Sequence, residues 1–454
     1  MDPESTDQLL RHLAQARWFA GKGRRAEIGS VTTLPWLTDS STWPAIRVEI
    51  VRVDYPPAED ETAPWPYELY QLLVAYHRAP VPGQLHAEIG RCTDRELGPV
   101  IGYDATQDPA ACAMLWRMLL GGQLTRHRDS EVSFHCTDDS ELDPDAVALP
   151  FTGQQSNTSV MFGDQAMVKF FRRIELGTNL DIEVHDALGR AGVRDVARLH
   201  GWIHGRWIQD GTPVEADLAM AVEKLAAAED GWGLALESLR AGGDFSADAA
   251  ALGAALAQIH LALREAFPVA EIDGRTTESL MRSRLDAAVE VAPVLADLTP
   301  GLESAFAQLG STALATQRVH GDFHLGQTLR TPQGWRIIDF EGEPAKSMAE
   351  RVALDSPWRD VAGMLRSFDY AAATVPGPGA ARWLANAREA FLTAYAGGLP
   401  GLREQAILRA YEADKAVYEL VYEVRNRPDW TAIPLGAIRT IANEGDHDGI
   451  RPRR

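Results

Sequence analysis

Long apolar runs, a basic excess and a cysteine framework are all missing from this chain of 454 residues. We find no stretch that approaches the roughly 20 apolar residues of a membrane-spanning helix, and the acidic N-terminus MDPESTDQLLRHL is unlike a signal peptide. The 44 Lys and Arg residues against 64 Asp and Glu residues give a net charge of −20, which disfavours nucleic acid or an anionic membrane as the main partner. The three cysteines are not in metal-ligand spacing and predict free thiols. We therefore expect a soluble, cytoplasmic protein.

The patterns along the chain predict an α+β protein with a β-rich first half and a helical second half. Alternating apolar residues at 45–55 and 67–77 indicate antiparallel strands, joined by a Pro-rich loop at 56–66. Beyond about residue 230 the chain is mostly helical, with a long apolar stripe at 248–267. The expected domains are 1–90, 91–224 and 225–454.

A hairpin followed by a helix is expected after residue 151. SNTSVMF and QAMVKFFRR flank a Gly-Asp pair, which predicts a β-hairpin with a two-residue turn. The following helix begins at Asn179 or Asp181 and ends before Gly192. Lys169 on the second strand and Glu183 on the helix are spaced like the Lys–Glu pair that orients a lysine toward the α- and β-phosphates of ATP. Two surface charges are the alternative, although the apolar neighbours of Lys169 are unusual for a solvated face.

The run VHGDFHLGQTLR, followed by WRIIDFEGEP, carries the strongest chemical signal. Protein kinases use His-Arg-Asp, four residues and then Asn. Here His-Gly-Asp is followed by four residues and Gln327, and Asp339 comes seventeen residues after Asp322. In this interpretation Asp322 takes the proton from an attacking hydroxyl, while Gln327 and Asp339 hold Mg²⁺ on ATP through oxygen atoms. Glu341 adds a carboxylate to a second metal or lies just outside it.

A less specific interpretation of this run is a satisfied polar loop, or a His-x-x-x-His metal pair made by His320 and His324. His-Gly-Asp alone would be weak evidence. Its combination with Gln327 and Asp339 at the right offsets, between a helix and a strand, favours a kinase.

Two further segments are expected to contact the nucleotide. The segment before the first hairpin strand lacks the Gly-x-Gly-x-x-Gly pattern of a phosphate-covering loop, but it offers polar donors to phosphate at Ser156, Asn157, Thr158 and Ser159. The backbone of Glu223 and Leu225 is expected to form the hinge that pairs with adenine. WFAGKGRR near the N-terminus lacks the full pattern of a phosphate-binding loop, and we favour a structural role for it.

The helix QAILRAYEADKAVYELVYEVRNRPDW presents aromatic and cationic side chains on one face. The members recur at 4-3-4-3 spacing: Tyr411, Lys415, Tyr418, Tyr422 and Arg425. Aromatic stripes usually belong to a core. This one alternates with Lys and Arg, and Glu419 and Glu423 stand nearby, which suits a sugar with its apolar C–H patches and many hydroxyls.

Together, HGDFHLGQ, IDFEGEP, SPWRDVAGMLRSFDYAA, QSNTSV with KFFRR, and YEADKAVYELVYEVRNRP resemble the maltokinases of actinobacteria, within the larger aminoglycoside-phosphotransferase-like group. The resemblance runs from RWFAGKGR to nearly the C-terminus and is weakest at 91–145 and in the tail. It implies a bilobal protein-kinase-like fold. Residues 1–90 would form an extra N-terminal cap domain, 91–224 the ATP lobe with an intermediate subdomain, and 225–454 a largely helical lobe.

The resemblance also implies an activity. ATP, with Mg²⁺, would phosphorylate the anomeric hydroxyl of maltose to give maltose 1-phosphate for glycogen synthesis from trehalose, often alongside trehalose synthase. By matching position Asp322 is the base, Gln327 and Asp339 are the magnesium ligands, and Lys169 with Glu183 is the phosphate anchor. The residues expected near the sugar are His320, His324, Glu341, Lys415, Tyr418, Tyr422, Glu423, Arg425 and Arg427. A monomer or a homodimer is expected.

Two other functions stay open. A related kinase for glucosamine or an aminoglycoside would suit the acidic chain, but it should line its pocket with carboxylates. Lys415, Arg425 and Arg427 are expected near the site, and they favour a neutral sugar. A non-catalytic binding protein on a kinase scaffold is disfavoured, because the nucleotide and metal residues are all present.

Overall fold

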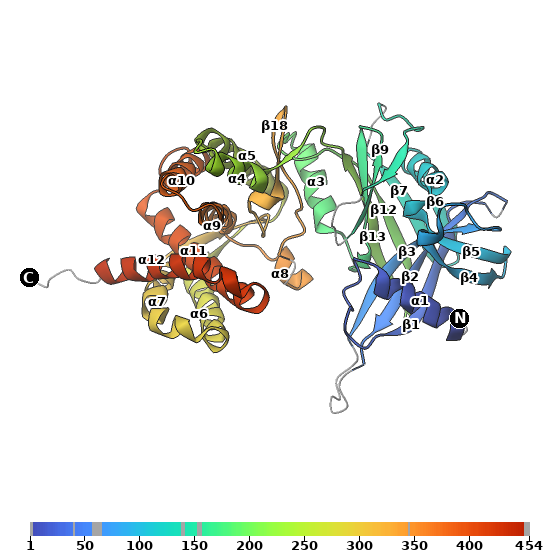
Figure 1. Ribbon diagram of the computed structural model, residues 1–454, viewed down its shortest axis with the longest axis horizontal. Helices are drawn as coiled ribbons and strands as arrows, with labels where there is room; N and C mark the ends of the chain where they lie inside the picture. The colour runs from blue at the N-terminus through green and yellow to red at the C-terminus, as the bar shows by residue number, and fades with distance from the viewer. Residues whose placement is uncertain are drawn as a thin grey trace, which may run out of the picture. The chain divides into compact units, whose positions relative to one another are not determined.

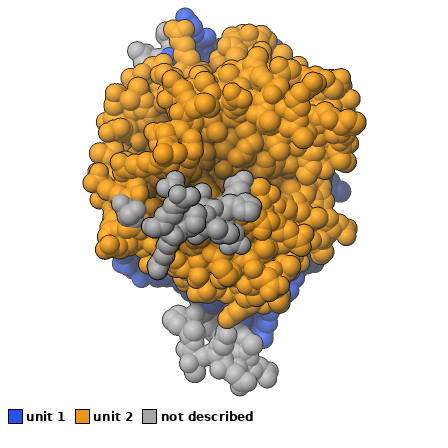
Figure 2. All heavy atoms as spheres, turned by 90° about the vertical axis from the view of Figure 1, so that its left-hand side faces the viewer, with its two compact units in different colours: residues 1–183, 198–226 blue, residues 184–197, 227–454 orange. Residues whose placement is uncertain are grey.

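The computed structural model describes residues 3–39, 41–56, 66–137, 141–151, 157–343 and 346–448. The chain divides into two compact units (Figures 1 and 2). Unit 1 comprises Met1–Glu183 and Arg198–Ala226, and unit 2 comprises Val184–Ala197 and Ala227–Arg454. Unit 1 contains the two large sheets and unit 2 most of the helices, which confirms the predicted α+β class. The finer division into three domains stays a prediction, and most of the Pro-rich segment at 56–66 lies outside the described residues.

The first sheet of unit 1 comes mainly from the N-terminal quarter of the chain. Its strands lie in the order β1-β2-β3-β5-β4, each antiparallel to its neighbours, and β11 also pairs with β3. Helix α1 (Pro3–Gln15) contributes Leu9 and Leu13 to the same core as Val51 and Tyr70. The alternating patterns therefore predicted β2 and β3 correctly. The bounds are β1 Glu27–Trp36, β2 Ala45–Asp54, β3 Tyr67–His77, β4 Glu88–Asp94, β5 Gly98–Asp104 and β11 Arg173–Ile174, with short 3-10 helices η1 Leu85–Ala87 and η2 Ala105–Gln107.

The second sheet of unit 1 has the order β6-β7-β12-β13-β10-β9-β8. The predicted hairpin is β9–β10, and Gly163 in its loop has φ +57°. Phe162 pairs with Ala166, so the loop has three residues rather than the predicted two. The third is Gln165, whose N–H donates to the carbonyl of Phe162 and whose carbonyl accepts the N–H of Lys224. The bounds are β6 Leu124–His127, β7 Ser130–Cys136, β8 Ala148–Pro150, β9 Thr158–Phe162, β10 Ala166–Phe170, β12 Leu199–Gln209 and β13 Thr212–Glu223, with helix α2 at Pro109–Leu120.

Helix α3 (Leu180–Arg190) begins and ends where its sequence predicts. The side-chain oxygen of Asn179 accepts the backbone N–H groups of Asp181 and Ile182 at 2.9 and 3.2 Å, which caps the first turn. Gly192 follows the last turn with φ +73°, a backbone conformation that glycine adopts easily. The division between the two units falls within this helix.

Unit 2 is a helical body around one large apolar core. Helices α5 and α10 pack closely, because Gly253 of α5 lets the two backbones approach: a Cβ at that position would lie 2.3 Å from the carbonyl oxygen of Phe391. The helices are α4 Gly231–Arg240, α5 Ser246–Ala266, α6 Gly274–Val291, α7 Thr299–Ala307, α8 Met348–Val352, α9 Trp358–Thr374, α10 Ala380–Ala396, α11 Leu402–Asn426 and α12 Ala432–Asp448. Short 3-10 helices lie at η3 Pro293–Leu298, η4 Leu309–Ser311, η5 Leu325–Gln327 and η6 Pro428–Trp430.

Helix α5 is long and apolar enough to cross a membrane by length and composition, although we expected no such stretch. Half of the apolar stretch of this helix is buried inside unit 2. Leu252, Leu256, Ile259 and Leu263 all belong to the core. Burial against neighbouring helices therefore accounts for its apolar character.

Two small sheets complete unit 2. One pairs β15 (Ala270–Asp273) with β16 (Ala313–Thr316), and the other has the order β14-β17-β18 (Glu229–Asp230, Thr328–Thr331 and Gly334–Ile337). The β17–β18 hairpin pairs Thr328 with Ile337. Gln327 immediately precedes β17 and Asp339 follows β18 by two residues, so the hairpin brings these two predicted metal ligands to the same end.

Candidate active site

The loop before η5, which contains Asp322, is fixed by hydrogen bonds to one buried carboxylate. Asp360, in the first turn of α9, is 1% exposed and accepts the backbone N–H groups of His320 and Gly321, both at 2.8 Å. Nε2 of His260 lies 2.9 Å from the same carboxylate. Burial opposes ionisation of Asp360, but His260 and the N–H groups outweigh it and keep its pKa below the ordinary value. Gly321 has φ +86°, so the loop turns sharply just before Asp322.

Helix α9 touches this loop at two further points. A Cβ on Gly363 would lie 2.5 Å from the carbonyl oxygen of Phe323, so only glycine fits there. The hydroxyl of Ser367 accepts the N–H of Leu325 at 3.1 Å. One helix therefore fixes the loop from Asp360 to Ser367.

Asp322 is paired with a lysine from α11. Nζ of Lys415 lies 3.4 Å from Oδ1 of Asp322 and 3.2 Å from Oε2 of Glu343, and His324 lies 3.8 Å from the other oxygen of Asp322. Burial raises the pKa of Asp322, but Lys415, His324 and His320 together bring it below the ordinary value. Burial likewise opposes the charge of Lys415, and Asp322 with Glu343 raises its pKa. The aspartate is therefore ionised and the lysine charged at neutral pH.

These two side chains line a pocket of about 660 Å³ within unit 2. The lining residues come from the loop that contains Asp322, from α4, α9 and α11, and from the segments after β18 and α11. The predicted residues among the lining are Asp322, His324, Lys415, Tyr418, Tyr422, Glu423 and Arg427. Glu419, which the sequence places near the expected sugar-binding face, lines it as well. Sequence reasoning missed Trp232, Glu343, Ser367, Tyr370 and Trp430, which are also part of the lining.

Three predicted sugar contacts lie elsewhere. His320 is 1% exposed, packs on the rings of Phe323 and Phe340 and bonds the carbonyl of Ile338, so it braces the loop from the interior. Arg425 is exposed on α11, outside the described lining. Glu341 lies near Asp339 instead. Tyr411, from the same predicted helix face as Lys415, is buried and donates to Asp355 at 2.7 Å, as a core aromatic would.

The pocket carboxylates are all hydrogen-bonded. Glu343 accepts from Tyr418 at 2.9 Å as well as from Lys415. Glu423 accepts from Tyr370 at 3.1 Å and pairs with Arg427 at 2.7 Å. These bonds fix the position of each carboxylate before any ligand enters.

Glu419 is held differently, because its partner lies behind the pocket. Nε and Nη2 of the buried Arg366 both donate to Oε2 of Glu419, at 2.9 and 2.7 Å, and Arg366 also pairs with Asp369 at 2.6 Å. Burial raises the pKa of Glu419 although Arg366 opposes the shift. Both arginine bonds go to one carboxylate oxygen, so Oε1 is the oxygen of Glu419 that can face a ligand.

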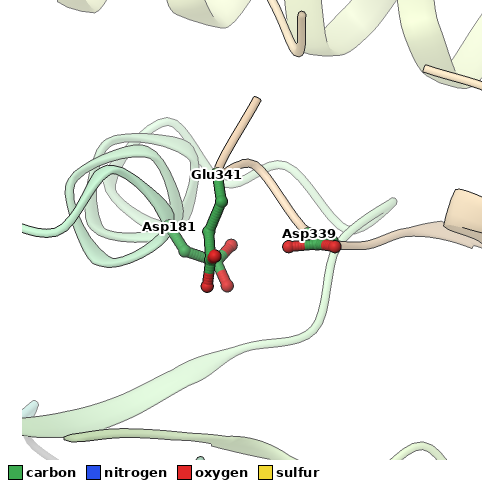
Figure 3. A group of neighbouring side chains, drawn as sticks. All are labelled: Asp181, Asp339 and Glu341. Carbon is green, nitrogen blue, oxygen red and sulfur yellow. The ribbon is translucent and has the colours of Figure 1, made fainter. Parts of the chain in front are cut away.

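The predicted metal ligands come together at the end of the β17–β18 hairpin. The amide nitrogen of Gln327 donates to Oδ2 of Asp339 at 3.2 Å. Both Asp339 and Glu341 follow β18 in the chain, and they present carboxylate oxygens within 4.8 Å of each other. Figure 3 shows the two side chains. Asp339 has φ +68°, a strained conformation for a residue other than glycine and one that clusters at functional sites. Two carboxylates and an amide oxygen fit a hard cation such as Mg²⁺.

The predicted phosphate anchor lies in unit 1. Nζ of Lys169 on β10 is 3.4 Å from Oδ2 of Asp181, in the first turn of α3. Asp181 precedes the expected partner Glu183 by two residues, and the pairing with Glu183 stays a prediction. A lysine held between a strand and a helix in this way is oriented before nucleotide binds.

The other expected nucleotide contacts are less complete. Ser156 lies outside the described residues, and Ser159 is buried. The side chains of Asn157 and Thr158 both accept from Arg172, so an interior arginine uses the groups expected to bind phosphate. At the expected hinge, Glu223 ends β13 and its N–H donates to the carbonyl of Arg198.

Comparisons with known proteins agree with this arrangement. Residues 12–108 match the maltokinase N-terminal cap domain, and residues 148–405, more than half of the chain, match the phosphotransferase enzyme family. The chain belongs to the phosphotransferase enzyme family. This phosphotransferase therefore carries both the cap and the catalytic domain that its sequence resembles, and it is a kinase.

The phosphotransferase also has similar relatives. It is 32% identical over 325 residues to a glucosamine kinase of Streptacidiphilus jiangxiensis, and this alignment covers 63% of this chain and 73% of the relative. It is 29% identical to a glucosamine kinase of Mycolicibacterium smegmatis, and this alignment covers 65% of this chain and 80% of the relative. A solved glucosamine kinase in complex with glucosamine, ADP and inorganic phosphate has a TM-score of 0.65 at 21% identity, over 96% of this chain and 98% of that one. The predicted kinase-like fold with an N-terminal cap is confirmed.

Proposed function

We propose that this phosphotransferase uses ATP to phosphorylate a hydroxyl group of a small sugar, and that its preferred acceptor is an amino sugar such as glucosamine. The observation that carries this proposal is the pocket beside Asp322, in which carboxylates outnumber cations. The names of the two relatives, both glucosamine kinases, support the same acceptor.

Asp322 is the group that would orient and deprotonate the attacking hydroxyl. Phosphoryl transfer asks mainly for positioning and neutralisation of charge, so a base held rigidly in its ionised form is suitable. The anchoring of the loop by Asp360 supplies the rigidity. Lys415, charged and 3.4 Å from the base, supplies a positive charge where phosphate oxygens would arrive.

The charge of the pocket distinguishes an amino sugar from a neutral sugar. Its cations are Lys415 and Arg427, and its carboxylates are Asp322, Glu343, Glu419 and Glu423. Burial lowers the pKa of His324 despite the nearby Asp322, so this side chain adds no positive charge at neutral pH. The carboxylates therefore outnumber the cations by two, and a ligand ammonium would reduce this excess. Oε1 of Glu419 is the acceptor that we propose for it.

This proposal revises the expectation of a neutral sugar. That expectation counted Arg425 among the pocket cations, but Arg425 is exposed outside the described lining. It also left Glu343 and Glu419 out of the set of site residues. A kinase that acts on a cationic acceptor was expected to line its pocket with carboxylates.

Maltose is the second candidate acceptor. The match of residues 12–108 to a maltokinase cap favours it, as do four aromatic side chains that could stack on sugar rings. They are Trp232, Tyr418, Tyr422 and Trp430. With maltose the product would be maltose 1-phosphate, and the predicted link from trehalose to glycogen, alongside trehalose synthase, would follow.

The nucleotide and metal contacts complete the proposal. Lys169, paired with Asp181 and followed on α3 by Glu183, would bind the α- and β-phosphates of ATP. Gln327, Asp339 and Glu341 would hold Mg²⁺, whose charge would be added to that of Lys415 at the transferring group.

A phosphotransfer assay with ATP and Mg²⁺ tests the acceptor. Glucosamine, N-acetylglucosamine, glucose, maltose and kanamycin are compared, and the product is located by NMR. N-acetylglucosamine is the matched control, because it keeps the ring and loses only the charge of the amine. We expect kcat/KM for glucosamine to exceed that for N-acetylglucosamine and glucose by about 10- to 100-fold, the range of one hydrogen bond to a charged group.

The variant Glu419→Gln sharpens the assay. It should reduce the preference for glucosamine about tenfold, because the interaction with the ammonium is weakened. The weaker pair with Arg366 would lower kcat/KM for glucosamine and glucose alike and so would not reduce the preference. A wild-type preference for maltose would replace the first candidate with the second. Absence of transfer to every sugar would contradict the proposed kinase activity.

A further inference from the structure

We propose that Arg172 is a positioning residue that couples the N-terminal cap to the hairpin β9–β10 and thereby sets the affinity for ATP. The inference rests on the proposed function, because that hairpin carries Lys169. It gives the cap a role in nucleotide binding.

Arg172 lies where the chain passes from one sheet of unit 1 to the other. Strand β10 ends at Phe170 in the second sheet, and β11 begins at Arg173 in the first. Gln71 of the cap clamps this crossover: its backbone N–H donates to the carbonyl of Arg172 at 2.8 Å. Its side-chain amide donates to the carbonyls of Phe171 and Leu218, at 3.1 and 3.0 Å.

The guanidinium of Arg172 then bonds to both sides of the junction. The residue is 1% exposed. Toward the cap, Nη2 donates to Asp104 at 2.6 Å and to Thr106 at 3.0 Å. Toward the hairpin, Nε donates to the hydroxyl of Thr158 at 2.7 Å, and the backbone N–H donates to the side chain of Asn157 at 3.2 Å. The planar guanidinium has enough donors for both sides, whereas the single ammonium of lysine would not span them in the same geometry.

The motif WFAGKGRR covers the same junction. The guanidinium carbon of Arg172 lies 5.2 Å from the ring of Trp18, a cation–π contact, and Trp18 packs on Tyr70 of the cap sheet at 5.9 Å. Trp18 therefore belongs to the surroundings of the buried arginine. This contact gives the motif a structural reason that does not require it to bind phosphate.

The effect on ATP would pass through two neighbours of Arg172. Thr158 is the first residue of β9 and belongs to the segment expected to bind the phosphates. Lys169 lies on β10, three residues before Arg172 in the chain. Without the guanidinium, Asp104 keeps a buried charge that has lost its cation. The hairpin also loses the side chain that joins Thr158 to Asp104, although Gln71 still bonds to the crossover. Lys169 would then be less well oriented, while the pocket of unit 2 would keep its residues.

The test compares Arg172→Met and Arg172→Lys with the wild type in the full-length protein. Affinity for a fluorescent ADP analogue is measured by anisotropy, alongside KM for ATP, KM for the sugar and the melting temperature. We expect Arg172→Met to weaken nucleotide binding and raise KM for ATP about tenfold, within the usual range of coupling between sites. KM for the sugar should stay within about twofold of the wild-type value. The nucleotide affinity of Arg172→Lys should lie between those of the wild type and Arg172→Met.

Arg47→Met is the matched control. Arg47 is a largely buried arginine of the same cap sheet, paired with Glu49 and Asp94 and stacked on Trp36. Its substitution should lower the melting temperature comparably and leave nucleotide affinity unchanged. Should Arg172→Met fail to fold, Arg172→Lys and Asp104→Asn, at the cap-side partner of the guanidinium, must each weaken nucleotide binding at least about threefold.

The outcomes separate this inference from the proposed function. Nucleotide affinity of Arg172→Met equal to that of the wild type, or an equal loss in Arg47→Met, would overturn the coupling alone. A wild-type protein that binds no nucleotide would overturn both.

Discussion

The two units hold their functional side chains in different ways. In unit 2, Asp322 follows a backbone fixed by the buried Asp360, and its carboxylate is paired with Lys415 from α11. In unit 1, Lys169 stands on a strand of 5 residues, close to the crossover at which Arg172 and Gln71 link the hairpin to the cap. The position of the proposed base is thus determined by the interior of a large helical body, whereas that of the proposed phosphate anchor depends on a junction between two sheets. Substitutions should therefore affect turnover when made in unit 2 and ATP affinity when made at that junction.

Asp322→Asn should give the largest effect. Loss of the base should lower kcat about 10³-fold or more, within the range of general base catalysis, and leave nucleotide affinity unchanged. Steady-state kinetics and binding of a fluorescent ADP analogue measure the two quantities. Asp414→Asn, at a carboxylate that pairs with Arg284 outside the described pocket lining, is the control. Full activity in Asp322→Asn would contradict the mechanism.

Asp339→Asn should give the second-largest effect. Replacing one carboxylate of the proposed metal site should raise the Mg²⁺ concentration for half-maximal activity about 10- to 100-fold. A Mg²⁺ titration at saturating ATP measures this shift. If the Mg²⁺ dependence stays that of the wild type, Asp339 is not a ligand.

Asp360→Asn tests whether the loop depends on its anchor. The amide can replace only part of the carboxylate's bonds to two N–H groups and His260, so we expect unit 2 to lose about 3 kcal/mol of stability. Because the base would also be less well held, kcat should fall about tenfold. Chemical denaturation and kinetics measure both. An unchanged kcat in a destabilised variant would show that the anchor serves folding alone.

The smallest expected effect is a shift in pH dependence, and Lys415→Met tests it. Loss of the positive charge proposed to meet the phosphate oxygens would lower kcat separately. Lys415 is the strongest influence that holds the pKa of Asp322 down against burial. Without it that pKa rises, so the base becomes protonated at a higher pH and the acid limb of the kcat/KM profile moves to higher pH. The profile is measured for wild type and variant on the same sugar. An acid limb that stays in place, or moves to lower pH, would contradict the assignment of Asp322 as the base.

Sequence patterns predicted the parts of the site that depend on local structure. Gln327 and Asp339 lie at one end of a hairpin, and Lys415 and Tyr418 lie on one face of a helix, so spacing alone brought them together. The position of Glu343 two residues after Glu341 in IDFEGEP is a signal that could have been used. Glu419 stands near the expected sugar-binding face of the helix, but no sequence signal predicted its pairing with Arg366 from α9.

The contribution of the arginines was the hardest to predict. Helix α11 ends at Asn426, and Arg427, beyond the helix, folds back onto Glu423. Arg425 lies one turn from Tyr422 on the same helix but remains exposed. Helical periodicity cannot foresee where a helix ends and how the next side chain returns. Arg427 nevertheless lines the pocket as expected, and Arg425 is the one expected cation that does not.

The course of α9 also matters for anyone who wishes to change the acceptor. The same helix that anchors the loop through Asp360 supplies Gly363, Ser367 and Tyr370 to the pocket. A library that randomises α9 would therefore disturb the catalytic base whenever it reshapes the wall. Tyr422 and Glu419 on α11 and Arg427 after it line the pocket without bonding to Asp360, although Glu419 pairs with Arg366 of α9. These three positions are where redesign, or natural divergence among relatives, can alter the acceptor and keep the catalytic loop intact.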